Sequence, residues 1–147
     1  MDIFQVLKKD HQEAKELFKK IKETGPRAAK SREKLFAQLK CDLEAHSYGE
    51  ENVFYPLLKE HAEMEDLVDE AMEEHEEVAD LLGDLEDLDH ESDEWNTKLA
   101  ELKKNVEHHV KEEEGKIFKM AKSILSKEEV QTLAQEFQDS KKQATAS

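Results

Sequence analysis

Apolar residues recur at steps of three and four along most of the chain, with charged residues between them. This spacing is typical of amphipathic α-helices, because it gathers the apolar side chains on one helix face. Turn signals at Gly25 and Pro26, around His61 and in residues 89–93 separate four such stretches. The pattern therefore predicts an all-α protein, an antiparallel up-down four-helix bundle.

A fifth, shorter apolar pattern follows the fourth stretch. Ser126 and Glu129 have the spacing of a capping box, in which each side chain bonds the other residue's backbone N–H at a helix start. Beyond about residue 139 the chain is polar and loses its periodicity. We therefore expect one domain over residues 1–139, a bundle with a short C-terminal helix, and a flexible tail over residues 140–147.

Each of the four predicted helices carries one histidine where its apolar stripe calls for a core residue. In the second and fourth helices a glutamate follows four residues later, so that imidazole and carboxylate share one helix face. Burying such groups without partners would be very costly, and a bound metal ion explains their presence in a core. The six residues are His11, His46, Glu50, His75, His109 and Glu113.

The four histidines are expected at one level of the bundle. Counted from the turns, each lies 14 to 16 residues from the same end, which at about 1.5 Å per residue is roughly 20–25 Å. His11 precedes His46 by 35 residues and His75 precedes His109 by 34, so the chain is an internal repeat of two helical hairpins. The adjacent His108 lies about 100° around the helix from His109 and is expected outside the site.

The apolar stripes continue beyond the two glutamates. In the second helix the next stripe residues are Val53 and Leu57, and Pro56 is expected to kink or end the helix. Four other residues lie beside the stripes, and the sequence leaves open whether they join the site. These are Glu51, Glu114, Tyr48 and Tyr55. The stripe of the fourth helix continues through Ile117, Met120 and Ile124.

Charge and composition narrow the classes of partner. The 147 residues include 22 basic and 37 acidic side chains, a net charge of −15, which argues against nucleic acid or an anionic membrane surface as partner. We expect no membrane span and no signal peptide, because apolar runs are short and the chain opens directly into an amphipathic helix. With Cys41 as its one cysteine, we expect a cytoplasmic protein, monomeric or weakly homo-oligomeric.

The ligand types indicate which metal to expect. Mixed imidazole and carboxylate ligands suit iron, manganese or zinc, and two carboxylates among four imidazoles suggest two bridged ions. Ferritin-like di-iron bundles instead use Glu-x-x-His. No glutamate stands three residues before any of the four histidines, so that class is disfavoured.

The order of one His, His-x-x-x-Glu, one His and His-x-x-x-Glu resembles the hemerythrin family, in its bacterial hemerythrin-like (HHE cation-binding) branch. The resemblance covers roughly residues 3–125 and includes the segments 46–56 and 109–118. It implies a non-haem centre of two iron ions bridged by oxide or hydroxide, with manganese or zinc as substitutes. It also implies that Glu50 and Glu113 bridge, that His11 and His46 bind one ion, and that His75 and His109 bind the other.

The resemblance implies a protein that binds or reacts with dioxygen, peroxide or nitric oxide, in sensing, scavenging or weak peroxidase- or catalase-type activity. Oxygen carriers of the family have a second histidine where this chain has Ala79, and their last carboxylate is an aspartate one residue further along than Glu113. Both differences argue against reversible oxygen carriage, and Ala79 and Ala14 are expected to leave room beside the ions. Iron storage or buffering, a reversible oxygen carrier and a helical interaction module remain the alternatives.

Overall fold

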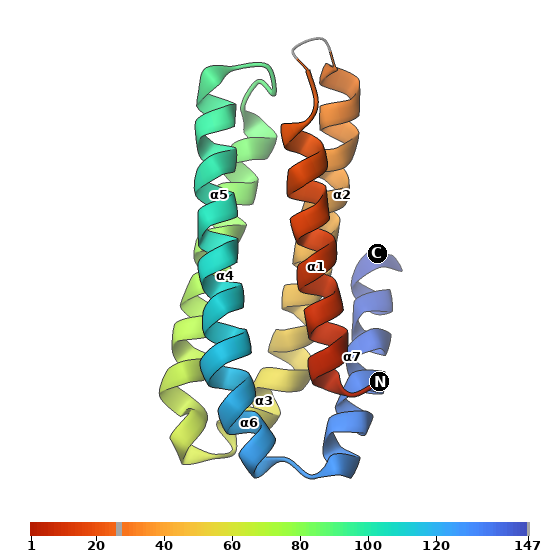
Figure 1. The fold of residues 1–147 in the computed structure, drawn as a ribbon, viewed down its shortest axis with the longest axis vertical. Helices are drawn as coiled ribbons and strands as arrows, with labels where there is room; N and C mark the ends of the chain where they lie inside the picture. The colour runs from red at the N-terminus through yellow and green to blue at the C-terminus, as the bar shows by residue number, and fades with distance from the viewer. Residues whose placement is uncertain (26–27, 147) are drawn as a thin grey trace.

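Two antiparallel helical hairpins make up the bundle. The computed structural model describes residues 1–25 and 28–146. Helix α1 (Ile3–Lys22) packs on α2 (Ala29–Gly49), and α4 (Glu65–Asp87) packs on α5 (Asp93–Glu112), as Figure 1 shows. The predicted all-α four-helix bundle is confirmed, and the described residues contain no strand.

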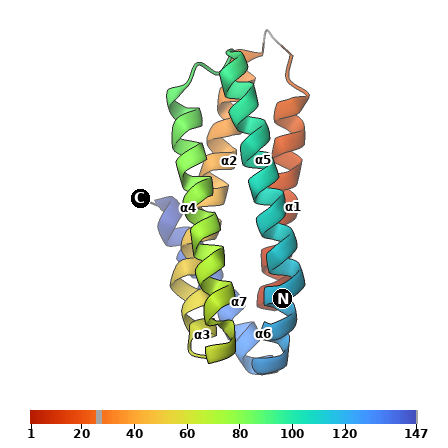
Figure 2. The same cartoon turned by 90° about the vertical axis from the view of Figure 1, so that its left-hand side faces the viewer.

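Shorter segments extend the second and fourth helices of the bundle. These segments are η1 (Glu50–Phe54), α3 (Tyr55–Lys59), η3 (Glu113–Ile117) and α6 (Phe118–Ile124). Figure 2 shows the segments α3 and α6 at the same end of the molecule. The turn η2 (Ala62–Met64) leads into α4, and α7 (Lys127–Ala146) follows α6. The turns η1 and η3 are π-helical, and η2 is a 3-10 turn.

The helix starts follow the sequence signals. Ser126 and Glu129 exchange hydrogen bonds of 2.9 and 3.1 Å before the first turn of α7, as the capping box predicts. Ser92 lies in the turn predicted at residues 89–93, and its side chain caps α5. The predicted stop at Pro26 lies outside the described residues, but α1 has ended at Lys22.

The π-helical turns change which residues face the core. A π turn holds one residue more than an α turn, so the apolar face moves on by one position. Phe54 and Leu58 are fully buried, whereas the predicted Val53 and Leu57 are only partly buried. The fourth helix shows the same displacement. Ile117 is buried as predicted, but the buried residues after it are Phe118, Ala121 and Leu125, whereas the predicted Met120 and Ile124 are only partly buried.

Helix α7 differs from the prediction. It is 20 residues long and continues to Ala146, so the expectation of a short fifth helix ending near residue 139 is wrong. In the C-terminal half of α7, Ser140 is buried and Lys141 forms an ion pair with Asp10 of α1. Neither polar residue adds to an apolar period in the sequence. Figure 1 shows α7 outside the bundle, against the α1 and α2 hairpin.

Two apolar clusters fill the bundle. One lies at the α3 and α6 end and contains Phe4, Phe54 and Phe118. The other lies towards the interhelical turns and includes Trp95, whose indole N–H donates to the Leu85 carbonyl at 3.0 Å. The predicted histidines and glutamates belong to neither cluster and occupy the level between them.

Candidate metal centre

The six residues singled out in the sequence converge in the structure. The six residues form two overlapping groups, and both groups include Glu50 and Glu113. Within each group the potential ligand atoms all lie within 4.8 Å of one another. The two glutamates are fully buried (0% exposed) and the four histidines are almost so. The first group adds His11 and His46, and the second adds His75 and His109.

In the first group each imidazole faces one glutamate through its Nε2 atom. His11 Nε2 lies 3.2 Å from Glu113 Oε1, and His46 Nε2 lies 3.1 Å from Glu50 Oε1. Neither nitrogen has a hydrogen-bond partner among the described residues, nor do Glu113 Oε1 and both oxygens of Glu50. Buried polar atoms in proteins are normally satisfied, so this group calls for a ligand.

In the second group two imidazole nitrogens also face each other. His75 Nε2 lies 3.2 Å from His109 Nε2 and 3.1 Å from Glu50 Oε1, and His109 Nε2 lies 3.3 Å from Glu113 Oε2. Two nitrogens bound to one ion at about 2.1 Å, in neighbouring positions, lie about 3 Å apart. The spacing therefore fits donors that share an ion.

Every histidine of the cluster also contacts a second carboxylate through Nδ1, the ring nitrogen that faces away from the cluster. The Nδ1 atoms lie 2.7–3.1 Å from carboxylate oxygens, and each partner is on another helical segment of the bundle. Each of these carboxylates also neighbours a residue of the cluster in sequence. Every helix of the bundle, together with the turn that continues it, therefore supports the histidine of another helix. The pairs are His11 with Glu114, His46 with Asp10, His75 with Glu51, and His109 with Glu74.

These outer carboxylates determine which ring nitrogen of each histidine carries the proton and which one presents a lone pair to the centre of the cluster. An ionised carboxylate only accepts hydrogen bonds, so each Nδ1 carries the proton and donates it. A neutral imidazole then presents the lone pair of Nε2 to the centre of the cluster. Lone pairs and carboxylate oxygens that converge in a buried space need positive charge between them, and this carboxylate–histidine pattern is common around protein-bound metals.

Without a metal ion, protons supply that positive charge. Burial lowers the pKa of His46, but the negative charge of Glu50 and the hydrogen bond to Asp10 outweigh it and raise the pKa to about 10. The pKa values of His75 and His109 are raised for similar reasons. Burial raises the pKa of Glu50, yet the surrounding histidines hold it well below its usual range. A metal ion and these protons would compete for the same nitrogens.

Tyr55 joins the site, although it lies off the predicted stripe. Its buried hydroxyl donates to Glu113 Oε2 at 2.5 Å and lies 3.4 Å from His75 Nε2. The backbone N–H of Tyr55 donates to the Glu50 carbonyl across the π turn, which brings the tyrosine onto the helix face of the cluster residues. The corresponding residue of the second hairpin, Phe118, stacks on His11 and carries no hydroxyl.

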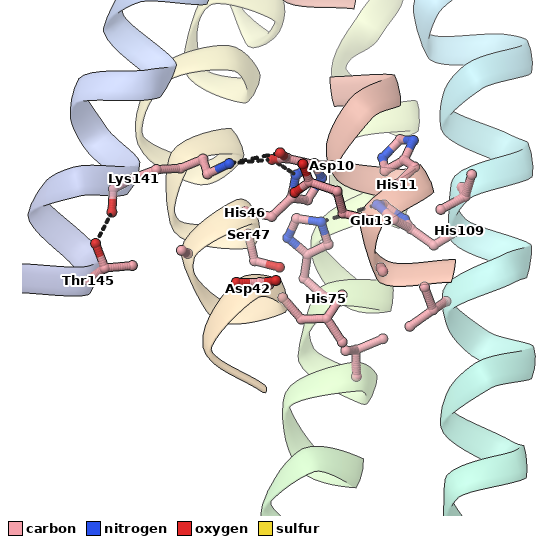
Figure 3. Close-up of a pocket in the computed structure, with 16 residues that line it drawn as sticks. Asp10, His11, Glu13, Asp42, His46, Ser47, His75, His109, Lys141 and Thr145 are labelled. Carbon is pink, nitrogen blue, oxygen red and sulfur yellow. Dashed lines mark hydrogen bonds and ion pairs between the residues drawn. The ribbon is translucent and has the colours of Figure 1, made fainter. Parts of the chain in front are cut away.

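A cavity of about 100 Å³ opens on the histidine side of the cluster, as Figure 3 shows. All four histidines line it, together with apolar side chains such as Ala14, Val78 and Val106. Lys141 and Thr145 of α7 form its outer wall. The cavity is not lined by Glu50, Glu113 or Tyr55. The carboxylates and the phenol therefore lie on the side of the cluster that faces away from the cavity.

The structure differs from the sequence interpretation at Ala79. This residue is exposed and lines a groove between α2 and α4, instead of leaving open space beside the His75 position. The phenol of Tyr55 lies at that position. Ala14, by contrast, lies in the wall of the cavity as expected.

Other polar residues take simpler places. His108 is exposed and its Nε2 atom lies 3.3 Å from the outer carboxylate Glu74, whereas His109 is buried and faces the cluster. Tyr48 is 42% exposed. The contacts of Glu74 and Asp10 with cluster histidines are not predicted from the sequence. Each residue immediately precedes a cluster histidine, and this adjacency is the sequence feature that could have indicated a place beside the cluster.

An all-α bundle with buried histidines and glutamates placed to hold cations defines a helical metal-binding protein. More specifically, the chain belongs to the hemerythrin family: residues 2–121 match the model of the hemerythrin HHE cation binding domain. Members of this family bind cations through the domain.

Two known proteins resemble the chain over most of its length. A solved hemerythrin HHE cation-binding domain-containing protein from Mycobacterium kansasii matches 99% of this chain and 88% of its own, with a TM-score of 0.87 and 24% identity. This likeness establishes the shared fold. A DNA nickase of Nostoc sp. is 28% identical over 141 residues. The match covers 96% of this chain but only 39% of the nickase.

No helix among the described residues is long and apolar enough to cross a membrane.

Proposed function

We propose that the protein holds a non-haem di-iron centre and uses it to bind or react with dioxygen, peroxide or nitric oxide. Glu50 and Glu113 would bridge the two ions, because each is shared by both groups of converging atoms. His11 and His46 would complete one ion position. The pair His75 and His109 would complete the other.

The cavity beside the histidines is the observation that supports this reactivity. Its volume of about 100 Å³ exceeds the roughly 30 Å³ that one water takes in the liquid and suits a molecule of a few atoms. Apolar walls admit small neutral molecules and exclude larger substrates. Iron would supply electron-transfer and Lewis-acid chemistry there, while the walls of this chain limit what reaches it.

Tyr55 would be a further ligand, at the position shared by His75 and His109. Burial raises the pKa of its phenol well above the usual range, and the nearby charges of Glu113 and Glu50 raise it further. Only a strongly charged cation in the cluster would offset these effects and bind the phenolate, an oxygen anion suited to ferric iron.

Storage is the weaker alternative, because the cluster presents a small fixed set of donors and a cavity too small for a mineral core. The activity of the Nostoc relative is not proposed either, since a net charge of −15 opposes a phosphate backbone. We place the protein in the cytoplasm, where the exposed free thiol of Cys41 would stay reduced.

Metal content, optical spectra and peroxide turnover test this proposal. Purified protein should contain two irons per chain, and its spectrum should change on exposure to oxygen or peroxide. Protein without bound metal, and without uptake of added iron, would exclude the centre. A loaded protein inert to oxygen, peroxide and nitric oxide would exclude the reactivity alone.

The variant Ala14→Val narrows the cavity without touching a donor atom. It should keep its iron and consume peroxide more slowly, by about tenfold, because the extra methyl groups occupy the approach to the histidines. Ala100→Val, on the exposed face of α5, is the matched control and should react like the unaltered protein. Equal rates for both variants would show that substrates reach the iron by another way.

A further inference from the structure

One of the four outer carboxylates is unlike the others. Asp10, which supports His46, also accepts two hydrogen bonds from the Lys141 ammonium of α7, at 2.8 and 2.9 Å (Figure 3). The side chains of Asp10 and Lys141 are only 11% and 23% exposed. Among residues 1–25 and 28–146, no lysine forms an ion pair with the other three carboxylates, Glu51, Glu74 and Glu114.

The internal repeat provides a comparison within the same molecule. Glu74 supports His109 in the second hairpin as Asp10 supports His46 in the first. The second contact of Glu74 is His108, at 3.3 Å, with 59% of its side chain exposed to water. The two hairpins therefore share the carboxylate but differ in the cation beyond it, a fixed lysine charge in one and an exposed imidazole in the other.

We propose that Lys141 makes the two ion positions unequal, by lowering the cation affinity of the position formed by His11 and His46. This inference rests on the proposed metal centre. An outer carboxylate strengthens a histidine ligand by attracting the proton on its Nδ1 atom. An ammonium on the same carboxylate weakens that attraction and adds a positive charge close to the ion, where low exposure limits screening by salt.

Tyr55 acts in the same direction from the other side of the cluster. Its hydroxyl lies near His75 and Glu113, whereas the corresponding Phe118 beside His11 offers no oxygen. An additional oxygen donor favours a cation at the position of His75 and His109. That position therefore fills first, and in the iron protein the ion beside His11 and His46 is the more easily reduced.

Zinc alone, titrated into metal-free protein, separates charge from packing at Lys141. Two calorimetric binding steps are expected, and the imidazole NMR signals of His46 and His109 identify the position filled in each. Lys141→Met keeps the chain length over the Phe137 ring, which Lys141 now covers at 5.5 Å. It should tighten the second step on the order of tenfold, the scale of outer-ligand changes.

Three variants complete the experiment. Lys141→Gln, which is neutral but still able to hydrogen-bond Asp10, should behave like Lys141→Met. Lys141→Arg keeps the charge and should restore the unaltered constants. His108→Gln is the matched control at the repeat position and should change the constants less than twofold. In the iron form, Lys141→Met should also lower the reduction potential.

The possible results separate this inference from the function beneath it. Two unequal steps that Lys141→Met and Lys141→Gln both bring closer together support the role of the charge. Equal steps in the unaltered protein, or a second step that Lys141→Met loosens or leaves unchanged, overturn the inference and leave the metal centre standing. Lys141→Gln matching the unaltered protein also overturns it, because a hydrogen bond would then suffice. A protein that binds no metal would overturn both.

Discussion

His109 shows how the structure fixes a single side chain that faces the cluster. Its Nδ1 atom donates to Glu74 at 2.8 Å, and its Nε2 atom lies among Glu113 and His75. The ring can hardly rotate, because both of its polar edges are engaged. Its neighbour His108 lies at the surface, with its Nε2 atom 3.3 Å from Glu74.

Replacing these two neighbours by alanine should have opposite consequences. His109→Ala removes a proposed ligand and should lose at least one ion per chain and lower the melting temperature of the loaded protein, since binding and folding are linked. His108→Ala should retain both ions and melt within a few degrees of the unaltered protein. Metal analysis and thermal unfolding measure both. Equal losses in the two variants would mean that helix α5 presents a different face.

Tyr55→Phe tests the phenol without changing the packing of the ring. The variant should keep its metal but lose the visible absorption band that a phenolate gives with ferric iron. The optical spectrum of the oxidised protein measures this directly. Phe118→Tyr is a matched addition at the corresponding position of the repeat. An unchanged spectrum in Tyr55→Phe would show that the phenol stays a hydrogen-bond donor to Glu113.

The cluster residues could be foreseen, because imidazoles and carboxylates on four apolar stripes at one level are too costly to bury without a cation between them. The position of Tyr55 in the site could not be foreseen. In a regular α-helix, a residue five positions after Glu50 lies on a different face from the cluster residues. The π turn corrects that angle, and its occurrence depends on packing around the buried glutamate. The long α7 was missed for a related reason: Lys141 is fixed by a charge on α1, which no local pattern reveals.

At the scale of elements, Gly49 sets the distance between α2 and α7. A Cβ atom at this position would lie 2.5 Å from the Phe137 ring of α7. Phe137 in turn packs edge-on against the ring of His46, with 5.7 Å between centroids. The absence of a side chain at Gly49 therefore lets α7 reach the site and place Lys141 on Asp10.

Gly49→Ala should consequently destabilise the protein by about 1–3 kcal/mol, the usual cost of overpacking a core. Urea unfolding of the metal-free protein measures the change in free energy. Gly83→Ala is the matched control, because nothing lies within 4 Å of its added Cβ on an exposed face of α4. It should stabilise the protein by about 0.5–1 kcal/mol. A neutral Gly49→Ala would mean that α7 can move away at little cost.

For the whole molecule, pH should act in opposite senses with and without metal. In the metal-free protein the pKa of His46 is raised from 6.5 to about 10. Its contribution to stability is thus complete below the unfolded value and is lost as pH rises through the folded value. The lowered pKa of Glu50 adds stability above its ordinary range, which disappears in acid.

Metal-bound protein needs the same histidines without their inward protons, so its extra stability should increase with pH. The difference in melting temperature between loaded and metal-free protein should therefore widen from pH 6 to pH 9. Thermal unfolding of both forms over this range measures the difference. Parallel curves would show that metal and protons do not compete for the histidines.

Each of the two groups of converging donor atoms takes three residues from one hairpin and a single glutamate from the other. An occupied centre would thereby fasten Glu50 to Glu113, which are 63 residues apart in the chain, much as a long-range covalent bridge shortens an unfolded chain. Under mechanical load, the two hairpins could then separate only after the centre ruptures. When a single metal-bound molecule is stretched from its two ends, it should unfold in one event at high force. A metal-free molecule should extend in two smaller steps, one hairpin outlasting the other.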